Sequence, residues 1–276
     1  MTASTRPASG FAEVNGTRLY YEITGSGQPL VMIHAGIADR RLWDEQWQVF
    51  AERYTVIRYD MRGFGKSAVP EGTFSHHDDL YALLVWLGIE QAYLMGCSRG
   101  GSTAIDVTLE HPELVKALIV VCSGPGGMPD DGAPPPRQWD EISSSFKAGD
   151  FGHTSELEVQ VWVDGPNRTP EQVERRVRDL VHEMNLIALQ NEAAADGKAE
   201  EQALEPPAYD RLGEIHVPTL IIVGAQDQPH VVAAGDLMEE RIAGAQKVVM
   251  HGTAHVPSLE QPAEFNRIVL DFLGGL

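Results

Sequence analysis

Short apolar runs rich in β-branched residues alternate with helical patterns along the chain, and this alternation constrains the fold more than any other feature. The apolar runs lie between glycine-rich or polar turns, at residues 30–33, 56–59, 92–95, 117–121, 220–223 and 248–250. Near-continuous apolar runs are typical of strands buried on both faces, and strands separated by helices favour a parallel sheet. The clearest helical patterns span residues 79–87, 100–110 and 263–273. The sequence therefore predicts an α/β fold with a mostly parallel central sheet flanked by helices.

Two segments depart from this alternation. Near the N-terminus, residues 11–14 and 18–23 flank Asn15-Gly16, a turn pair typical of β-hairpins. Between residues 124 and 209 no convincing strand occurs, whereas residues 139–146, 156–163 and 170–195 show helical patterns. Because this stretch is too long for a structureless loop, we predict a helical cap at residues 127–209, inserted between two parts of the core at residues 1–126 and 210–276.

The acidic composition narrows the classes of partner. The chain carries 40 Asp and Glu against 21 Lys and Arg, a formal net charge of −19, so we expect no basic stripe that would bind nucleic-acid phosphates or anionic lipids. No apolar run reaches the roughly 18 residues of a transmembrane helix, and the first residues lack the apolar core of a signal peptide. We therefore expect a cytoplasmic protein without nucleic-acid or membrane partners. The oligomeric state stays open.

The two cysteines, Cys97 and Cys122, lie in or beside predicted central strands. Two cysteines make no disulfide framework, so we expect both to be buried thiols. The sequence shows no cluster with metal-ligand spacing and no glycine-rich loop that would cradle a phosphate. We therefore predict no metal site and no cofactor.

One motif carries a specific chemistry. The run at residues 92–95 leads into Gly96-Cys97-Ser98-Arg99-Gly100, a G-x-S-x-G pattern between a predicted strand and a predicted helix, which is the context of a nucleophile elbow. A strand that becomes a helix within so few residues holds the serine in a strained backbone conformation. Side chains two positions away on either side would collide, so glycine is needed there. Ser98 is therefore the candidate nucleophile.

A serine hydroxyl needs a base, and the base needs an orienting acid. Asp227 follows the run at residues 220–223, and His255 follows the run at residues 248–250. Loops beyond the carboxyl ends of parallel strands are where ligand sites of open α/β sheets lie. The order Ser, Asp, His along the chain also fits this type of site. Asp227 and His255 are the candidate acid and base, with His251 and His230 as alternative bases.

With these motifs the chain resembles the α/β-hydrolase superfamily over nearly its whole length. Residues 60–67 are similar to the D-x-R-G-x-G-x-S segment of that family, and residues 255–262 are similar to its H-x-x-x-x-E-x-P ending. The second match favours His255 over His251. In the first, we expect Asp60 and Arg62 to order a loop near the site. The resemblance implies a capped α/β-hydrolase fold, and a serine nucleophile argues against the branches that use a carboxylate.

The resemblance also implies an oxyanion hole of two backbone N–H groups. One belongs to Arg99, the residue after the candidate nucleophile, and the other to the loop after an early strand. Here that loop reads His34-Ala35-Gly36-Ile37 and is similar to the H-G-x segment of the family. Alanine stands where glycine is usual, so the second donor is Gly36 or Ile37.

The resemblance implies hydrolysis of a small carboxylic ester or lactone through an acyl-enzyme on Ser98. A carbon–carbon bond hydrolase and a cofactor-free perhydrolase with the same triad are the alternatives, and a non-catalytic ligand-binding protein on this fold remains as a rival of another class. We expect His34, Ile37 and Trp162 to contact the substrate. The Arg99 side chain either binds a substrate carboxylate or pairs with an acid of the cap or core.

Overall fold

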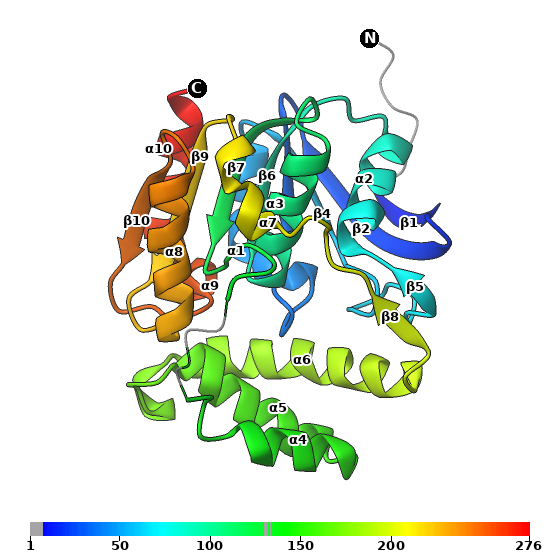
Figure 1. Cartoon of the computed structure of the whole chain (residues 1–276), viewed down its shortest axis with the longest axis vertical. Helices are drawn as coiled ribbons and strands as arrows, with labels where there is room; N and C mark the ends of the chain where they lie inside the picture. Colours follow the sequence, from blue (N-terminus) through cyan, green and yellow to red (C-terminus); the bar gives the residue numbers. More distant parts are fainter. Residues whose placement is uncertain (1–7, 130–131, 133) are drawn as a thin grey trace.

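The computed structural model describes residues 8–129, 132 and 134–276, so a few residues of the predicted first core part and cap lie outside it. Helices cover both faces of an eight-stranded sheet, and further helices form a layer at one end (Figure 1). The predicted α/β fold class is therefore confirmed. The strands of the sheet are β1 (Ser9–Val14), β2 (Thr17–Gly25), β3 (Pro29–Ile33), β4 (Thr55–Tyr59), β6 (Ala92–Cys97), β7 (Val115–Val121), β9 (Thr219–Gly224) and β10 (Gln246–Met250).

The strand order is β1-β2-β4-β3-β6-β7-β9-β10, and β2 is the strand that runs antiparallel to its neighbours. The pairs from β4 to β10 are all parallel. The β1–β2 hairpin turns at Asn15 and Gly16, which both have positive φ, at 46° and 69°. This is the geometry for which an Asn-Gly pair is suited. The predicted hairpin and the six predicted strands are therefore present.

Alternate residues of each central strand face opposite sides of the sheet. Leu30 and Met32 of β3 belong to the apolar cluster that includes Phe50 of α1 (Asp44–Ala51) and Phe265 of α10 (Pro262–Gly274). Val31 and Ile33 point into the other cluster, to which four further helices contribute. Those helices are α2 (His76–Leu87), α3 (Arg99–Glu110), α7 (Ala208–Arg211) and α8 (Pro229–Arg241). The sheet is thus buried on both faces, as near-continuous apolar runs require.

A helical layer lies at one end of the sheet. It consists of α4 (Trp139–Lys147), α5 (Phe151–Val159), a π-helical turn (Gln160–Asp164), a 3-10 turn (Pro170–Gln172) and α6 (Arg175–Ala195). Figure 1 shows α6 between the core and the α4–α5 pair. Val177, Val181 and Met184 of α6 join the apolar cluster of the sheet, so the layer is packed against the core. The division of the chain at residues 126 and 209 stays a prediction.

Several elements differ from the expectations. Strands β5 (Gly72–Phe74) and β8 (Ala199–Glu201) pair in parallel as a second, two-stranded sheet, although no strand was expected at β8. Three-residue strands are too short to show a periodic pattern. The helix expected from residue 170 is divided, because Val173 and Glu174, between the 3-10 turn and α6, have non-helical ψ angles of 141° and 126°. The remaining short elements are 3-10 turns at Arg40–Trp43 and Leu212–Glu214 and the helix α9 (Pro257–Glu260).

No helix in the described ranges is both long enough and apolar enough to span a lipid bilayer.

The central strands should carry much of the stability. Leu94 of β6 is fully buried in the apolar cluster on the α3 side, so Leu94→Ala should lower the free energy of unfolding by about 2–5 kcal/mol through lost burial and a cavity. Val85, which is 56% exposed on α2, provides the control: Val85→Ala should change it by less than about 0.5 kcal/mol. Urea unfolding followed by circular dichroism measures both. Similar losses in the two variants would contradict the assigned core.

Candidate active site

Ser98 lies in the turn that joins β6 to α3. Its backbone has φ 52° and ψ −118°, a region that residues with a side chain seldom adopt. Two hydrogen bonds anchor it there. The Ser98 N–H donates to the Val121 carbonyl over 2.9 Å, and the Ser123 hydroxyl donates to the Ser98 carbonyl over 2.5 Å. The Ser98 side chain remains partly exposed.

Three glycines make this turn feasible. A Cβ on Gly96 would lie 2.0 Å from the Gly100 carbonyl oxygen, and a Cβ on Gly100 would lie 2.4 Å from the Ile33 carbonyl oxygen. A Cβ on Gly101 would lie 2.5 Å from Cβ of Ser123. Each distance is well below van der Waals contact. The glycines therefore meet the steric requirement that the sequence motif implied.

Asp227 and His255 come from neighbouring loops. Asp227 follows β9, His255 follows β10, and the two strands pair in parallel. The His255 Nδ1 and Asp227 Oδ2 atoms are 2.7 Å apart, and both side chains are almost fully buried. The second carboxylate oxygen accepts the Gln228 N–H over 2.7 Å. The other candidate bases, His251 and His230, have exposed side chains. The structure thus pairs the predicted acid with the predicted base.

The His255 loop also lies beside the serine turn. The thiol of Cys97, the residue before Ser98, donates to the His255 carbonyl over 3.4 Å, and the Cys122 thiol donates to the Ala254 carbonyl over 3.5 Å. Among the described residues, no hydrogen bond joins the Ser98 hydroxyl to the His255 ring. In free enzymes such bonds are often long and tighten when substrate binds.

Both cysteines are free buried thiols, as expected. Burial raises the pKa of Cys97 and of Cys122 and keeps them protonated. Cys122 is of further interest because its sulfur, Asp227 and His255 offer metal-ligand atoms within 4.8 Å of one another. Metal binding would require the thiolate, which burial disfavours, and the facing atoms of the acid and the base already bind each other. We therefore interpret the trio as a hydrogen-bonded network.

The expected oxyanion donors are unpaired. Within the described part of the chain, the N–H groups of Gly36, Ile37 and Arg99 donate to no protein acceptor. Gly36 and Ile37 follow β3, whose neighbour in the sheet is β6. A Cβ built on Gly36 would lie 3.2 Å from Nε of Arg99, so this loop directly adjoins the start of α3.

His34 has a role different from the expected substrate contact. It is fully buried; its Nε2 accepts the Met61 N–H over 3.0 Å, and its Nδ1 lies 2.8 Å from the Ala35 carbonyl oxygen. Burial lowers the pKa of His34 and favours the neutral ring. Because both ring nitrogens bind main-chain atoms, neither is available to a substrate. His34 instead ties the Gly36 loop to the loop after β4.

The segment at residues 60–67 orders that same loop. The Asp60 carboxylate accepts hydrogen bonds from the Arg40 backbone, the Arg40 guanidinium and the Lys66 N–H, each over 2.9 Å. The Arg62 guanidinium binds both carboxylate oxygens of Asp79, over 2.8 and 2.6 Å. Asp60 and Arg62 therefore order a loop, as predicted.

The Arg99 side chain pairs with an acid of the protein. Its guanidinium lies 2.5 Å from Glu201 of β8, and both side chains are more than two-fifths exposed. His76 of α2 is 3.8 Å from the same carboxylate oxygen. Of the two interpretations of this side chain, the structure favours the ion pair over a free site for a substrate carboxylate.

Trp162 lies against His255. The two rings have centroids 4.6 Å apart at an interplanar angle of 38°, and the centroid of the His230 ring is 6.2 Å from that of Trp162. Trp162 belongs to the π-helical turn of the helical layer. Ile37 is 8% exposed, and its contact with substrate stays a prediction. The Trp162–His255 contact could not be predicted from the sequence, because the two residues come from distant elements.

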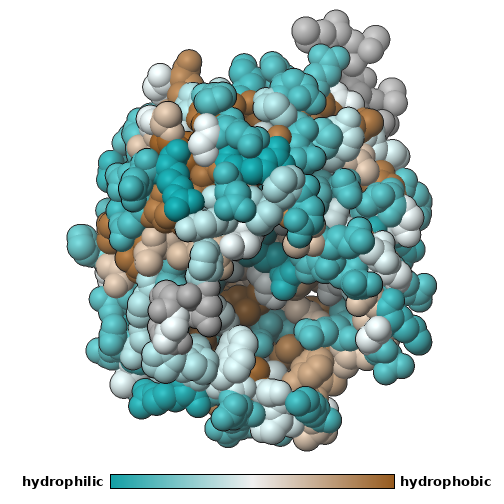
Figure 2. All heavy atoms as spheres, in the orientation of Figure 1, coloured by the Kyte–Doolittle hydropathy of each residue, from teal (hydrophilic) through white to brown (hydrophobic). Residues whose placement is uncertain are grey.

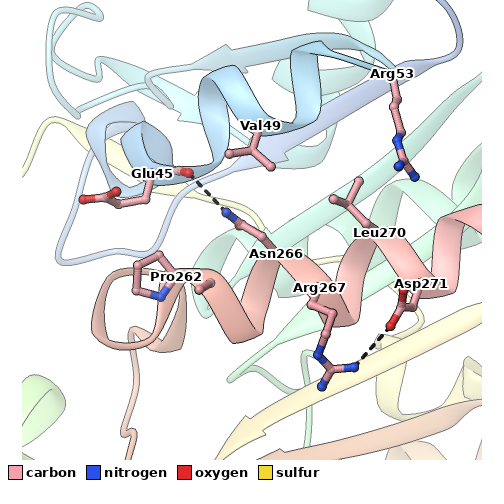
Figure 3. A pocket seen from close by; sticks show the side chains of 9 residues that line it. Glu45, Val49, Arg53, Pro262, Asn266, Arg267, Leu270 and Asp271 are labelled. Carbon is pink, nitrogen blue, oxygen red and sulfur yellow. Dashed lines mark hydrogen bonds and ion pairs between the residues drawn. The ribbon is translucent and has the colours of Figure 1, made fainter.

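One cavity lies away from this site and another borders it at Arg99. A groove of about 610 Å³ runs between α1 and α10 (Figure 3) and touches none of the candidate catalytic residues. A second cavity of about 490 Å³ lies beside α3 and is lined by Arg99, Ser102, Asp106, His76 and residues 201–205, among others. Figure 2 shows that this side of the molecule is hollowed between the core and the helical layer, with hydrophobic residues in the hollow.

The surroundings of Asp106 in the second cavity disfavour the charged form of its carboxyl group. Its Oδ1 atom is buried and has no hydrogen-bond partner among the residues that the structure describes, and His77 is 3.9 Å from its other oxygen. Burial, together with the nearby carboxylates of Glu110 and Glu201, raises the pKa of Asp106 from 3.8 to about 7.

The chain is similar to known proteins over most of its length. The family model described as alpha/beta hydrolase fold matches residues 28–262. A pimeloyl-acyl-carrier-protein methyl ester esterase of Aeromonas hydrophila is 28% identical over 264 residues, covering 91% of this chain and 97% of that protein. The 2-hydroxy-6-oxo-6-phenylhexa-2,4-dienoate hydrolase of Comamonas testosteroni is 29% identical, covering 92% and 91%. The structure of an esterase from Exiguobacterium antarcticum superposes with a TM-score of 0.78 at 25% identity, covering 96% and 98%.

The raised pKa of Asp106 predicts a pH-dependent stability. Between pH 4 and 7 the folded chain retains a proton that an unfolded carboxyl has lost, so the contribution of Asp106 to stability falls as the pH rises through that window. Asp106→Asn removes the charge and should raise the melting temperature at pH 8, by roughly 2–4 °C per kcal/mol, with little change at pH 4. Differential scanning calorimetry at both pH values measures this. The exposed control Glu52→Gln should show no such difference, and an equal shift of Asp106→Asn at both pH values would contradict the assignment.

Proposed function

The chain belongs to the alpha/beta hydrolase fold family, and from this premise we propose that it hydrolyses a small carboxylic ester or lactone through an acyl-enzyme on Ser98. The observation that carries the proposal is the strained backbone of Ser98 at the end of a central strand, beside the loop that holds the hydrogen-bonded His255–Asp227 pair. A buried carboxylate, an imidazole and a partly exposed, strained serine together form a system for acyl transfer.

The first half of the reaction forms the acyl-enzyme. The Ser98 hydroxyl oxygen attacks the carbonyl carbon of the substrate, and His255 takes the hydroxyl proton on Nε2. Asp227 accepts the hydrogen bond from Nδ1–H, which fixes the tautomer and stabilises the imidazolium. The intermediate then expels the alcohol, which receives the proton from His255. In a lactone the alcohol stays attached to the acyl group.

The second half regenerates the serine. Water attacks the ester carbon of the acyl-enzyme and gives its proton to His255, and the bond to Ser98 then breaks as that proton returns to the serine oxygen. In both halves the negative charge on the carbonyl oxygen is stabilised by the unpaired N–H of Arg99 and that of Gly36 or Ile37. Loss of one such donor costs about 3–4 kcal/mol in related sites. The N-terminal end of α3 adds a favourable dipole.

A carbon–carbon bond hydrolase is the second candidate. It is supported by the similarity to the Comamonas hydrolase, at 29% identity over nearly the whole chain, because the same nucleophile, base and acid would serve both reactions. The Aeromonas relative is an ester hydrolase at nearly the same identity, 28%. Perhydrolysis by the same triad, ligand binding without catalysis, the small-molecule partner and the cytoplasmic location remain predictions from the sequence.

Hydrolysis of p-nitrophenyl acetate, butyrate and octanoate tests the proposal. The wild type should hydrolyse at least one ester, and Ser98→Ala should lower kcat by at least about a thousandfold, because it removes the nucleophile. The dependence of kcat/KM on the length of the acyl chain measures the size of the acyl pocket. The folded state of the variant is checked by circular dichroism.

Two results would overturn ester hydrolysis on Ser98. Turnover that survives Ser98→Ala would exclude that residue as the nucleophile. If the wild type hydrolyses none of the esters but cleaves a vinylogous diketone, the second candidate would replace the first.

The pairing of Arg99 with Glu201 predicts that its side chain does not select acidic substrates. Arg99→Met should change kcat/KM for a neutral ester and for an ester with a free carboxylate in its acyl chain by the same factor, within about threefold, because the backbone N–H is retained. Steady-state kinetics on the two esters measures this. A loss confined to the acidic ester would show that the guanidinium leaves Glu201 to bind substrate.

A further inference from the structure

One segment of the helical layer, residues 161–168 (the contact segment), lies against the loops that carry both Asp227 and His255. Two main-chain carbonyls make the first contacts. The Val161 carbonyl accepts a hydrogen bond from the Gln228 side chain over 2.7 Å, and the Trp162 carbonyl accepts the His255 N–H over 3.3 Å. Gln228 directly follows Asp227 and donates its own N–H to that carboxylate. The contact segment therefore binds both the loop that carries Asp227 (the acid loop) and the loop that carries His255 (the base loop).

The Trp162 side chain makes the second contact with the base. Its indole is 4.6 Å from the imidazole of His255, centroid to centroid, at 38° between the ring planes. The Trp162 side chain packs against the apolar cluster of the sheet and against the small apolar cluster of the helical layer, which hold it in place. A cation is attracted to the face of an indole, so this contact favours the imidazolium that forms when His255 accepts the Ser98 proton.

Arg168 fixes the other end of the contact segment. Its guanidinium donates to the Asp164 and Val163 carbonyls within the segment, over 2.9 and 2.6 Å. It also donates to the Gly252 carbonyl over 2.8 Å and to Glu260 over 2.7 Å. These last two acceptors flank His255 in the sequence.

Glu260 links Arg168 to the loop that carries His255. Its second carboxylate oxygen accepts the N–H of Ala254, the residue before His255, over 2.7 Å. The Arg168 and Glu260 side chains are only 11% and 6% exposed. A buried ion pair with these additional hydrogen bonds has little freedom to move.

The approach of the contact segment to the acid loop requires glycine. Gly165 has a φ of 75°, and a Cβ there would lie 2.2 Å from the Gln226 carbonyl oxygen. At Gly165 the main chain of the contact segment is therefore packed directly against the main chain of the loop that carries Asp227.

We propose that Trp162 and Arg168 are positioning residues for His255, so that the contact segment is a fixed part of the catalytic centre as well as a cover over it. The inference rests on the proposed function, in which His255 is the base. It differs from the substrate contact expected for Trp162: a substrate contact acts on the acyl chain, whereas a positioning contact acts on the proton transfer whatever the chain.

Steady-state kinetics on p-nitrophenyl acetate and butyrate tests the proposal with Trp162→Leu and Arg168→Met. Each should lower kcat by about tenfold or more, since small displacements of a catalytic group have large effects on rate. KM should change by less than about threefold, and the loss should be equal on the two esters. Trp162→Phe, which keeps an aromatic face, should retain more activity than Trp162→Leu.

Matched controls come from the same layer. Trp139 of α4 is 49% exposed, and Trp139→Leu should leave kcat unchanged. Arg176 of α6 also joins the layer to the core, through an exposed ion pair with Glu45 of α1 and a 3.4 Å hydrogen bond to the Leu259 carbonyl. Arg176→Met therefore removes a link between layer and core but leaves the hydrogen bonds of Ala254, His255 and Glu260 in place. If Arg168→Met fails to fold because Glu260 is left unpaired, the double variant Arg168→Met, Glu260→Gln replaces it, since the glutamine oxygen still accepts the Ala254 N–H.

A spectroscopic measurement separates failure of this proposal from failure of the proposed function. In protein labelled with ¹³C-histidine, the His255 ring signal is assigned by its loss in His255→Gln. The signal should move in Trp162→Leu, because the indole ring current is removed, and it should stay in place in Trp139→Leu. This result requires no turnover.

The positioning role is overturned if both Trp162→Leu and Arg168→Met keep kcat within about twofold of the wild type. It is also overturned if the loss lies in KM and grows with acyl length, which would show a substrate contact. If the wild type lacks Ser98-dependent hydrolysis, the proposed function fails, and a His255 signal that does not move in Trp162→Leu then overturns the contact itself.

Discussion

The backbone of Ser98 is the constraint on which the rest of the structure depends. A residue with a side chain is held at φ 52°, and it is held there because α3 starts in direct contact with β6 and β3. That contact is feasible only without side chains at Gly96, Gly100 and Gly101, where an added Cβ would lie 2.0–2.5 Å from its neighbours. The same close approach brings the Gly36 loop and the start of α3 together. The position of the serine and its expected oxyanion donors thus have one steric origin.

Parallel strands bring the remaining groups to the same edge. Because β6, β9 and β10 run in the same direction within one sheet, the loops after them emerge together, and residues far apart in sequence become neighbours. The acid–base pair is then completed by a hydrogen bond between buried side chains. The helical layer adds a second set of contacts to this edge, through the Val161 and Trp162 carbonyls and the Arg168 guanidinium. The layer and the loops therefore share one packed interface.

The sequence was most informative where local chemistry decides the structure. The Asn15-Gly16 turn, the apolar runs of the sheet and the glycine pattern around Ser98 each depend on neighbours within a few residues, and the structure has the expected element at each place. It was less informative where the pattern is short or mixed. Strands β5 and β8 are three residues long, and α1 and α8 were not among the expected helices. His34 was expected at the substrate but is buried with both ring nitrogens bound to main-chain atoms.

The sequence by itself determined the fold class, the candidate nucleophile and the order of the acid and base, because periodicity, glycine placement and strand-end loops are local properties. Only the tertiary structure decided which side chains meet. Arg99 pairs with Glu201, 102 residues away, and Arg168 pairs with Glu260, 92 residues away. The indole of Trp162 likewise contacts His255, a residue far from it in the sequence. Such contacts depend on how the helical layer packs against the sheet, and no local pattern encodes the distance between two surfaces that meet only after folding.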